Sequence, residues 1–126
     1  MTITITPEEI DQFRAEFTAY PEALKALDEI ADCEGDLEDA AIALAIQVGQ
    51  EPSTNDRWID GLAKRWRHII CQDDLKEQLE DGLTADSLTA FAAQANLPLK
   101  LATPVALYVI KTGLDRFCQP LAEKIQ

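Results

Sequence analysis

The sequence predicts an all-α fold: one compact domain over residues 1–126, a bundle of about six to seven short helices behind an extended N-terminal tail over residues 1–5. Three observations support this fold class. Helix start and stop signals recur along the chain, and apolar residues follow one another at the helical spacing of three and four. After residue 6, no stretch clusters Val, Ile and Thr between turn residues as a strand would.

The first helix is predicted to begin at Pro7, because proline is favoured at the first helical position. Thr6 and Glu9 have the spacing of a capping box, in which each side chain binds the other residue's backbone amide. An interior proline removes a helical hydrogen bond and clashes with the preceding turn, so Pro21 should start a second helix that runs to about Ala31. The alternating TITIT stretch has no partner strand and is expected to be a tail.

A third helix is predicted between the N-cap residue Asp36 and the stop residue Gly49. Its residues 40–46 are all apolar. Because a helix that is apolar on every face is buried on every face, we expect it to be the central helix of the bundle. The loop that follows holds Ser53 or Thr54 as the cap of the next helix.

The fourth helix carries the stretch WIDGLAKRWRHII and has two different sides. At about 100° per residue, Trp58 and Trp66 fall on the apolar side, so both should be mostly buried. The opposite side mixes acidic, basic and thiol side chains. Its positive residues, which we call the basic face, are Arg57, Lys64, Arg67 and His68. On an acidic protein such a face is either a solvated helix surface or a contact site for a partner.

The C-terminal part of the chain predicts three further helices. A short one ends at Gly82, and another runs from the cap residue Thr84 to about Asn96. Thr103 and Pro104 have the types expected for the cap and first position of the last helix. Within that helix, Gly113 marks either close packing against a neighbour or an end and restart.

Charge is unevenly distributed along the chain, whose formal net charge is -12. Residues 1–51 contain 13 acidic and two basic residues, a net charge of -11, whereas residues 52–126 contain ten acidic and nine basic residues. Such a field repels phosphate backbones and attracts basic surfaces. We therefore expect a protein partner and no direct binding of nucleic acid.

The three cysteines, Cys33, Cys71 and Cys118, are widely spaced and include no CxxC pair. This pattern predicts reduced thiols, no disulfide and a cytoplasmic location. The N-terminus lacks the basic and apolar regions of a signal peptide, and no nearly uncharged stretch reaches the roughly 20 residues that span a bilayer. No membrane partner is expected.

No motif for catalysis, metal binding or cofactor binding stands out. The acidic stretch DCEGDLED lacks the ligands that a calcium loop centred on Gly35 needs at Ile30 and Ala41, and it suits a helix cap instead. His68 and Cys71 are three residues apart, yet zinc needs three or four ligands and a nucleophilic cysteine needs an oriented base. The five glycines are scattered singly, unlike a phosphate-binding loop. We expect no metal and no cofactor.

The sequence favours a non-catalytic protein–protein interaction or regulatory adaptor module. It would bind a protein partner, or a second copy of itself, through charge-complementary surfaces that include the basic face. One alternative is an acidic mimic that inhibits a nucleic-acid-binding protein or toxin by occupying its basic surface. A second alternative is an enzyme with an unannounced site near His68 and Cys71.

Overall fold

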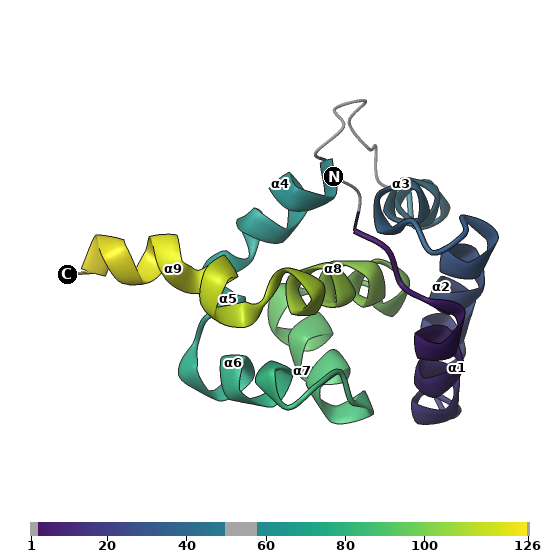
Figure 1. Ribbon diagram of the computed structural model, residues 1–126, viewed down its shortest axis with the longest axis horizontal. Coiled ribbons are helices and arrows are strands. Elements are labelled where there is room, and N and C mark those ends of the chain that lie inside the picture. Colours follow the sequence, from purple (N-terminus) through teal and green to yellow (C-terminus); the bar gives the residue numbers. More distant parts are fainter. Residues whose placement is uncertain (1–2, 50–57, 126) are drawn as a thin grey trace.

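The computed structural model describes residues 3–49 and 58–125, except for the side chains of residues 58, 60, 73 and 120–125. The described part is all-α, which confirms the predicted fold class: it holds helices and no strand (Figure 1). The helices are α1 (Pro7–Glu16), α2 (Pro21–Asp32), α3 (Leu37–Gln47), α4 (Trp58–Arg65), α5 (Arg67–Ile70), α6 (Asp73–Glu80), α7 (Ala85–Ala95), α8 (Leu99–Thr112) and α9 (Leu114–Ile125).

Local capping places several helix ends where the sequence predicts them. The Thr6 hydroxyl accepts a hydrogen bond from the Glu9 amide at 3.2 Å, and the Thr6 amide donates to the Glu9 carboxylate at 3.1 Å, which completes the capping box. Pro21 is the first residue of α2 and separates it from α1. The Asp36 carboxylate accepts hydrogen bonds from the amides of Glu38 and Asp39 at the start of α3. DCEGDLED is therefore a turn and helix cap.

The helices outnumber the expected total because two predicted helices are each divided. The predicted fourth helix breaks at Trp66 into α4 and α5. The predicted last helix ends at Thr112 and restarts at Leu114. Gly113 between them has a φ of +99°, and a Cβ added there would meet no atom within 4 Å. Gly113 therefore marks the end of one helix and the start of the next, and not close packing against a neighbour.

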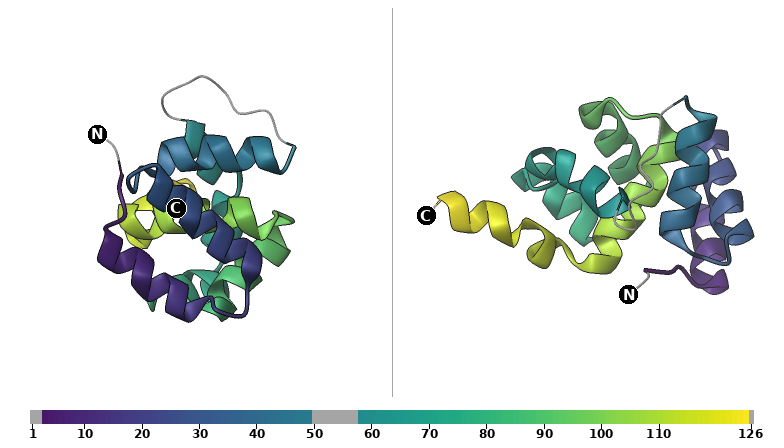
Figure 2. Two further views of the ribbon diagram at one scale, coloured as in Figure 1. Left: turned by 90° about the vertical axis from the view of Figure 1, so that its right-hand side faces the viewer. Right: turned by 90° about the horizontal axis from the view of Figure 1, so that it is seen from above.

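The central helix of the bundle is α8. It contacts α2, α3, α4, α7 and α9, and Figure 2 shows it running between α1–α3 on one side and α4–α7 on the other. Seven consecutive residues, from Leu101 to Leu107, are buried. Because α8 packs on α2 and α3 and also on α4 and α7, it holds the two sides of the bundle together.

The expectation that residues 40–46 form the central helix is wrong. Four residues of this stretch are buried, namely Ala40, Ala41, Leu44 and Ala45. Ile46, in contrast, is 63% exposed, and Ile42 is only partly buried. Because α3 is apolar on every side, its sequence does not show which face will be buried. Packing against α2, α4 and α8 buries one face of the helix.

The start of α8 also differs from the expectation for Thr103 and Pro104. The helix begins at Leu99, so both residues lie inside it, and both are buried. The Thr103 hydroxyl donates to the Leu99 carbonyl oxygen at 2.7 Å. Pro104 removes one backbone hydrogen bond near the helix start, and burial of the surrounding apolar residues outweighs this loss.

The N-terminal tail has a partner, contrary to expectation. We call residues 3–5 the N-terminal strap. The Ile5 amide donates to the Gly35 carbonyl oxygen at 2.9 Å, and the Leu37 amide donates to the Ile3 carbonyl oxygen at 3.3 Å. Gly35 has a φ of +85°, and a Cβ there would lie 2.2 Å from the Ile5 carbonyl oxygen. Only glycine therefore fits where the strap passes over this turn. In this position of the strap, Ile5 packs in the core.

Candidate functional site

The described residues of the basic face are divided between two helices, with Lys64 in α4 and with Arg67 and His68 in α5. Trp66 lies in a turn between α4 and α5, and it is only partly buried against the core. Lys64 and His68 are exposed on either side of this break. Arg57, like the side chain of Trp58, lies outside the described residues.

Arg67 is half-buried, although the helical period predicts an outward side chain. Its guanidinium carbon lies 4.8 Å from the centroid of the Phe117 ring of α9, and its Nε atom is buried without a hydrogen-bond partner. A guanidinium is planar and weakly hydrated for a cation, so it stacks readily on an aromatic face. Arg67 therefore belongs to the contact between α5 and α9 and contributes little to a free basic surface.

A disulfide joins Cys71, just after α5, to Cys118 of α9, with the two Cα atoms 5.7 Å apart. The expectation of three reduced thiols without a disulfide is therefore wrong for this pair. The two cysteines are 47 residues apart in the sequence, and only the approach of α9 to α5 brings them together. In this oxidised state Cys71 has no thiolate to offer a metal or a substrate, and His68 beside it is exposed.

Cys33 is the free cysteine of the described residues, and it lies half-buried at the end of α2. Burial raises the pKa of its thiol, and the negative charges of Glu29, Asp39, Asp36 and Asp32 raise it further. Because the thiolate is the nucleophile, we expect iodoacetamide to alkylate Cys33 at neutral pH several-fold more slowly than it alkylates an unstructured cysteine peptide. Mass spectrometry of the native protein and of that peptide after timed alkylation measures this, and equal rates would contradict the expectation.

Many exposed acidic residues lie on α1–α3 and on the turn between α2 and α3. We call the exposed carboxylates of this region the acidic surface: Glu8, Asp11, Glu16, Glu22, Asp28, Asp32, Glu34 and Asp39. Arg14 pairs with Asp28, and both Lys25 and Lys100 pair with Glu22.

Five carboxylates of the acidic surface have neither an ion pair nor a hydrogen bond to a described side chain or backbone amide. They are Glu8, Asp11, Asp32, Glu34 and Asp39. Glu16, in contrast, accepts a hydrogen bond from the Ala85 amide at 3.0 Å. The local cations neutralise only part of the region, which leaves a net negative field over α1–α3.

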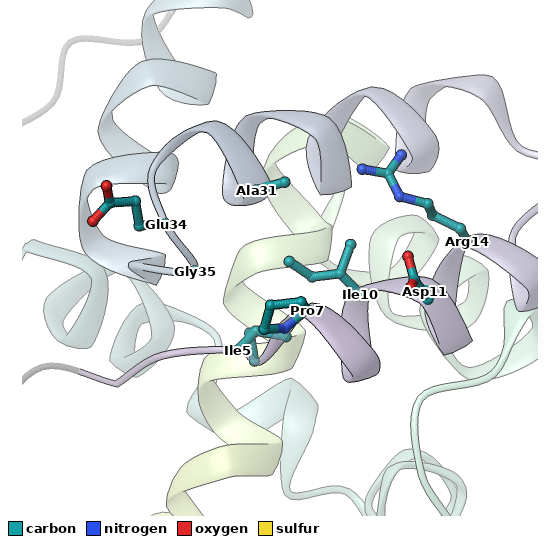
Figure 3. A pocket seen from close by; sticks show the side chains of 8 residues that line it. All are labelled: Ile5, Pro7, Ile10, Asp11, Arg14, Ala31, Glu34 and Gly35. Carbon is teal, nitrogen blue, oxygen red and sulfur yellow. The ribbon is translucent and has the colours of Figure 1, made fainter.

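A cavity of about 370 Å³ opens beside the acidic surface, between the N-terminal strap, the start of α1 and the end of α2. Its lining residues are Ile5, Pro7, Ile10, Asp11, Arg14, Ala31, Glu34 and Gly35. Figure 3 shows the apolar side chains in the middle, with Glu34 toward one end and Asp11 and Arg14 toward the other. Sequence reasoning misses this cavity, because it exists only once the strap folds over the turn at Gly35.

No protein-family model, curated protein or solved structure matches this chain. In residues 3–49 and 58–125, no group of three or more His, Cys, Asp or Glu side chains is arranged to hold a metal ion. Nor is any described helix both long enough and apolar enough to cross a bilayer.

Proposed function

We propose that the protein is a non-catalytic protein–protein interaction module that binds a basic surface of its partner through the acidic surface of α1–α3. The observation that carries this proposal is the set of five carboxylates without a described partner on one side of the bundle. Concentrated charge of one sign steers an oppositely charged partner toward the surface and disfavours partners of like charge.

The state of the basic face favours a different protein over a second copy as the partner. Among the described residues of this region, Arg67 packs on Phe117 and is half-buried, and the exposed basic side chains are Lys64, Arg65 and His68. These basic side chains are fewer than the carboxylates of the acidic surface. A nucleic-acid-binding protein or a toxin has a strongly basic surface of the required kind, and binding there would make this protein an acidic mimic.

The proposal is tested by neutralising charge in two places. One variant carries Glu8→Gln, Asp11→Asn, Asp32→Asn and Glu34→Gln on the acidic surface. The matched control carries Asp74→Asn, Glu77→Gln, Asp81→Asn and Asp86→Asn, which removes the same charge from exposed positions around α6 and α7. The probe is an arginine-rich peptide, whose affinity is measured by calorimetry at low and high salt.

We expect the acidic-surface variant to bind the peptide roughly tenfold more weakly, because each charge contact contributes a few tenths of a kcal/mol or more. The control should change affinity far less, and added salt should weaken binding by the wild type. Equal losses in the two variants would mean that only net charge matters and would contradict the proposal. Light scattering of the protein alone, over the same salt range, reports whether a second copy competes as the partner.

A further inference from the structure

We propose that the cavity beside the strap receives an arginine side chain of the partner and anchors it on the acidic surface. This inference rests on the proposed binding of a basic partner and assigns a specific contact within it. The cavity volume of about 370 Å³ lies at the small end of the roughly 300–1,000 Å³ typical of ligand pockets. A cavity of this size suits one long side chain better than a helix.

The middle of the cavity fits the alkyl stem of such a side chain. Ile5 and Ile10 are buried in the core and form its floor, while Pro7 and Ala31 add apolar wall (Figure 3). Arginine commonly lays its methylene groups along apolar surface while its charged end stays in contact with water or an acid. An apolar cavity with an acidic residue at each end, Glu34 and Asp11, matches both parts of that side chain.

The charges at the rim favour a cation and place it at the Glu34 end. Arg14 lies toward the Asp11 end, where its guanidinium pairs with Asp28 of α2. Glu34 is exposed and has no described ion pair, so its carboxylate is available to a guanidinium. An anionic ligand would meet two rim carboxylates, Asp11 and Glu34, against the single cation Arg14.

The position of Glu34 is fixed by the backbone. Its φ of +58° is in the left-handed region, and the following Gly35 amide donates to the Ile30 carbonyl oxygen at 2.8 Å. The Glu34 amide donates to the Ala31 carbonyl oxygen at 3.0 Å. The turn therefore fixes the backbone of Glu34 at one end of the cavity before any partner arrives, and on binding only its exposed side chain has to reorient toward the guanidinium.

Arginine fits this cavity better than lysine for two reasons. A guanidinium is more weakly hydrated than an ammonium group, so less hydration is lost when it approaches an apolar wall. It also presents five N–H donors in a planar fork, which can form two hydrogen bonds to one carboxylate.

The test uses n-butylguanidinium as the probe, since it reproduces the arginine side chain without a peptide. Backbone amide shifts of the isotopically labelled protein are followed by NMR during titration. We expect saturable shifts at Ile5, Ile10 and Gly35. The neutral analogue n-butylurea has a similar shape and should bind at least roughly threefold more weakly, while n-butylammonium should fall between them.

Three variants locate the contact. Glu34→Gln should weaken n-butylguanidinium binding roughly threefold or more, whereas the matched change Asp32→Asn, two residues earlier in the sequence and outside the cavity lining, should not. Ala31→Leu places a larger side chain in the cavity and should abolish the shifts. Because Ala31 is exposed, this variant is expected to fold like the wild type.

Several outcomes would overturn the inference. Equal binding of n-butylurea would make the cavity a neutral apolar site, and equal effects of Glu34→Gln and Asp32→Asn would mean that only the general field attracts the cation. An arginine-rich peptide that binds the wild type and Ala31→Leu equally well would leave the acidic surface as the docking site without this anchor. If n-butylguanidinium binds as expected and the peptide does not, the proposed protein partner fails while the cation site stands.

Discussion

Removal of the disulfide between Cys71 and Cys118 is expected to lower the free energy of unfolding by up to about 4 kcal/mol. The bond closes a loop that spans 47 residues, and a cross-link of this length restricts the unfolded chain strongly. It also fastens α9 to α5. The remaining described attachments of α9 include the stacking of Arg67 on Phe117 and an ion pair of 3.0 Å between Lys76 and Asp115.

Urea unfolding of the wild type with and without a thiol reductant measures the loss, and the Cys71→Ser, Cys118→Ser double variant should reproduce the reduced protein. Cys33→Ser is the matched control, because Cys33 is a free cysteine and its loss should leave the effect of reductant unchanged. Thiol titration of the oxidised, unfolded wild type should find fewer free thiols than titration of the reduced protein. Identical unfolding curves in both redox states would refute the stabilising role of this bond.

Replacement of Phe91 by alanine is expected to lower the free energy of unfolding by about 3–5 kcal/mol, the usual cost of truncating a large core aromatic. Phe91 of α7 is fully buried, and α7 packs on α5, α6 and α8. Losing the ring removes its buried apolar area and leaves a cavity that the surrounding helices fill only in part.

Gln94→Ala serves as the control on the same helix, since Gln94 is exposed and alanine suits a helix at least as well. Its unfolding free energy should stay within about 0.5 kcal/mol of the wild type. The same urea titrations measure both variants. A loss below about 1 kcal/mol for Phe91→Ala would show that the core around α7 is loosely packed.

The parts of the fold that the sequence predicts well are those decided by neighbouring residues. The caps at Thr6 and Asp36 and the helix start at Pro21 depend on groups only a few positions apart, so their spacing alone reveals them. The helical spacing of apolar residues then leads to an all-α fold class without knowledge of any long-range contact.

The features that sequence reasoning misses depend on segments far apart in the chain. Apolar residues alone do not show which helix is central, because both α3 and α8 are rich in them. The disulfide and the partial burial of Arg67 follow from the packing of α9 on α5, and the cavity follows from the pairing of the strap with the turn at Gly35. The local spacing of apolar residues does not predict contacts between segments that lie far apart in the sequence.

The central place of α8 affects how the chain folds as it leaves the ribosome. Synthesis proceeds from the N-terminus, so α2, α3, α4 and α7 all emerge before the helix on which they pack. Contacts between α2 and α8 join residues far apart in the chain, and such non-local contacts slow folding relative to a bundle of sequential neighbours. Until residues 99–112 emerge, the nascent chain exposes the apolar faces that α8 later covers, and in that interval aggregation and chaperone binding compete with folding.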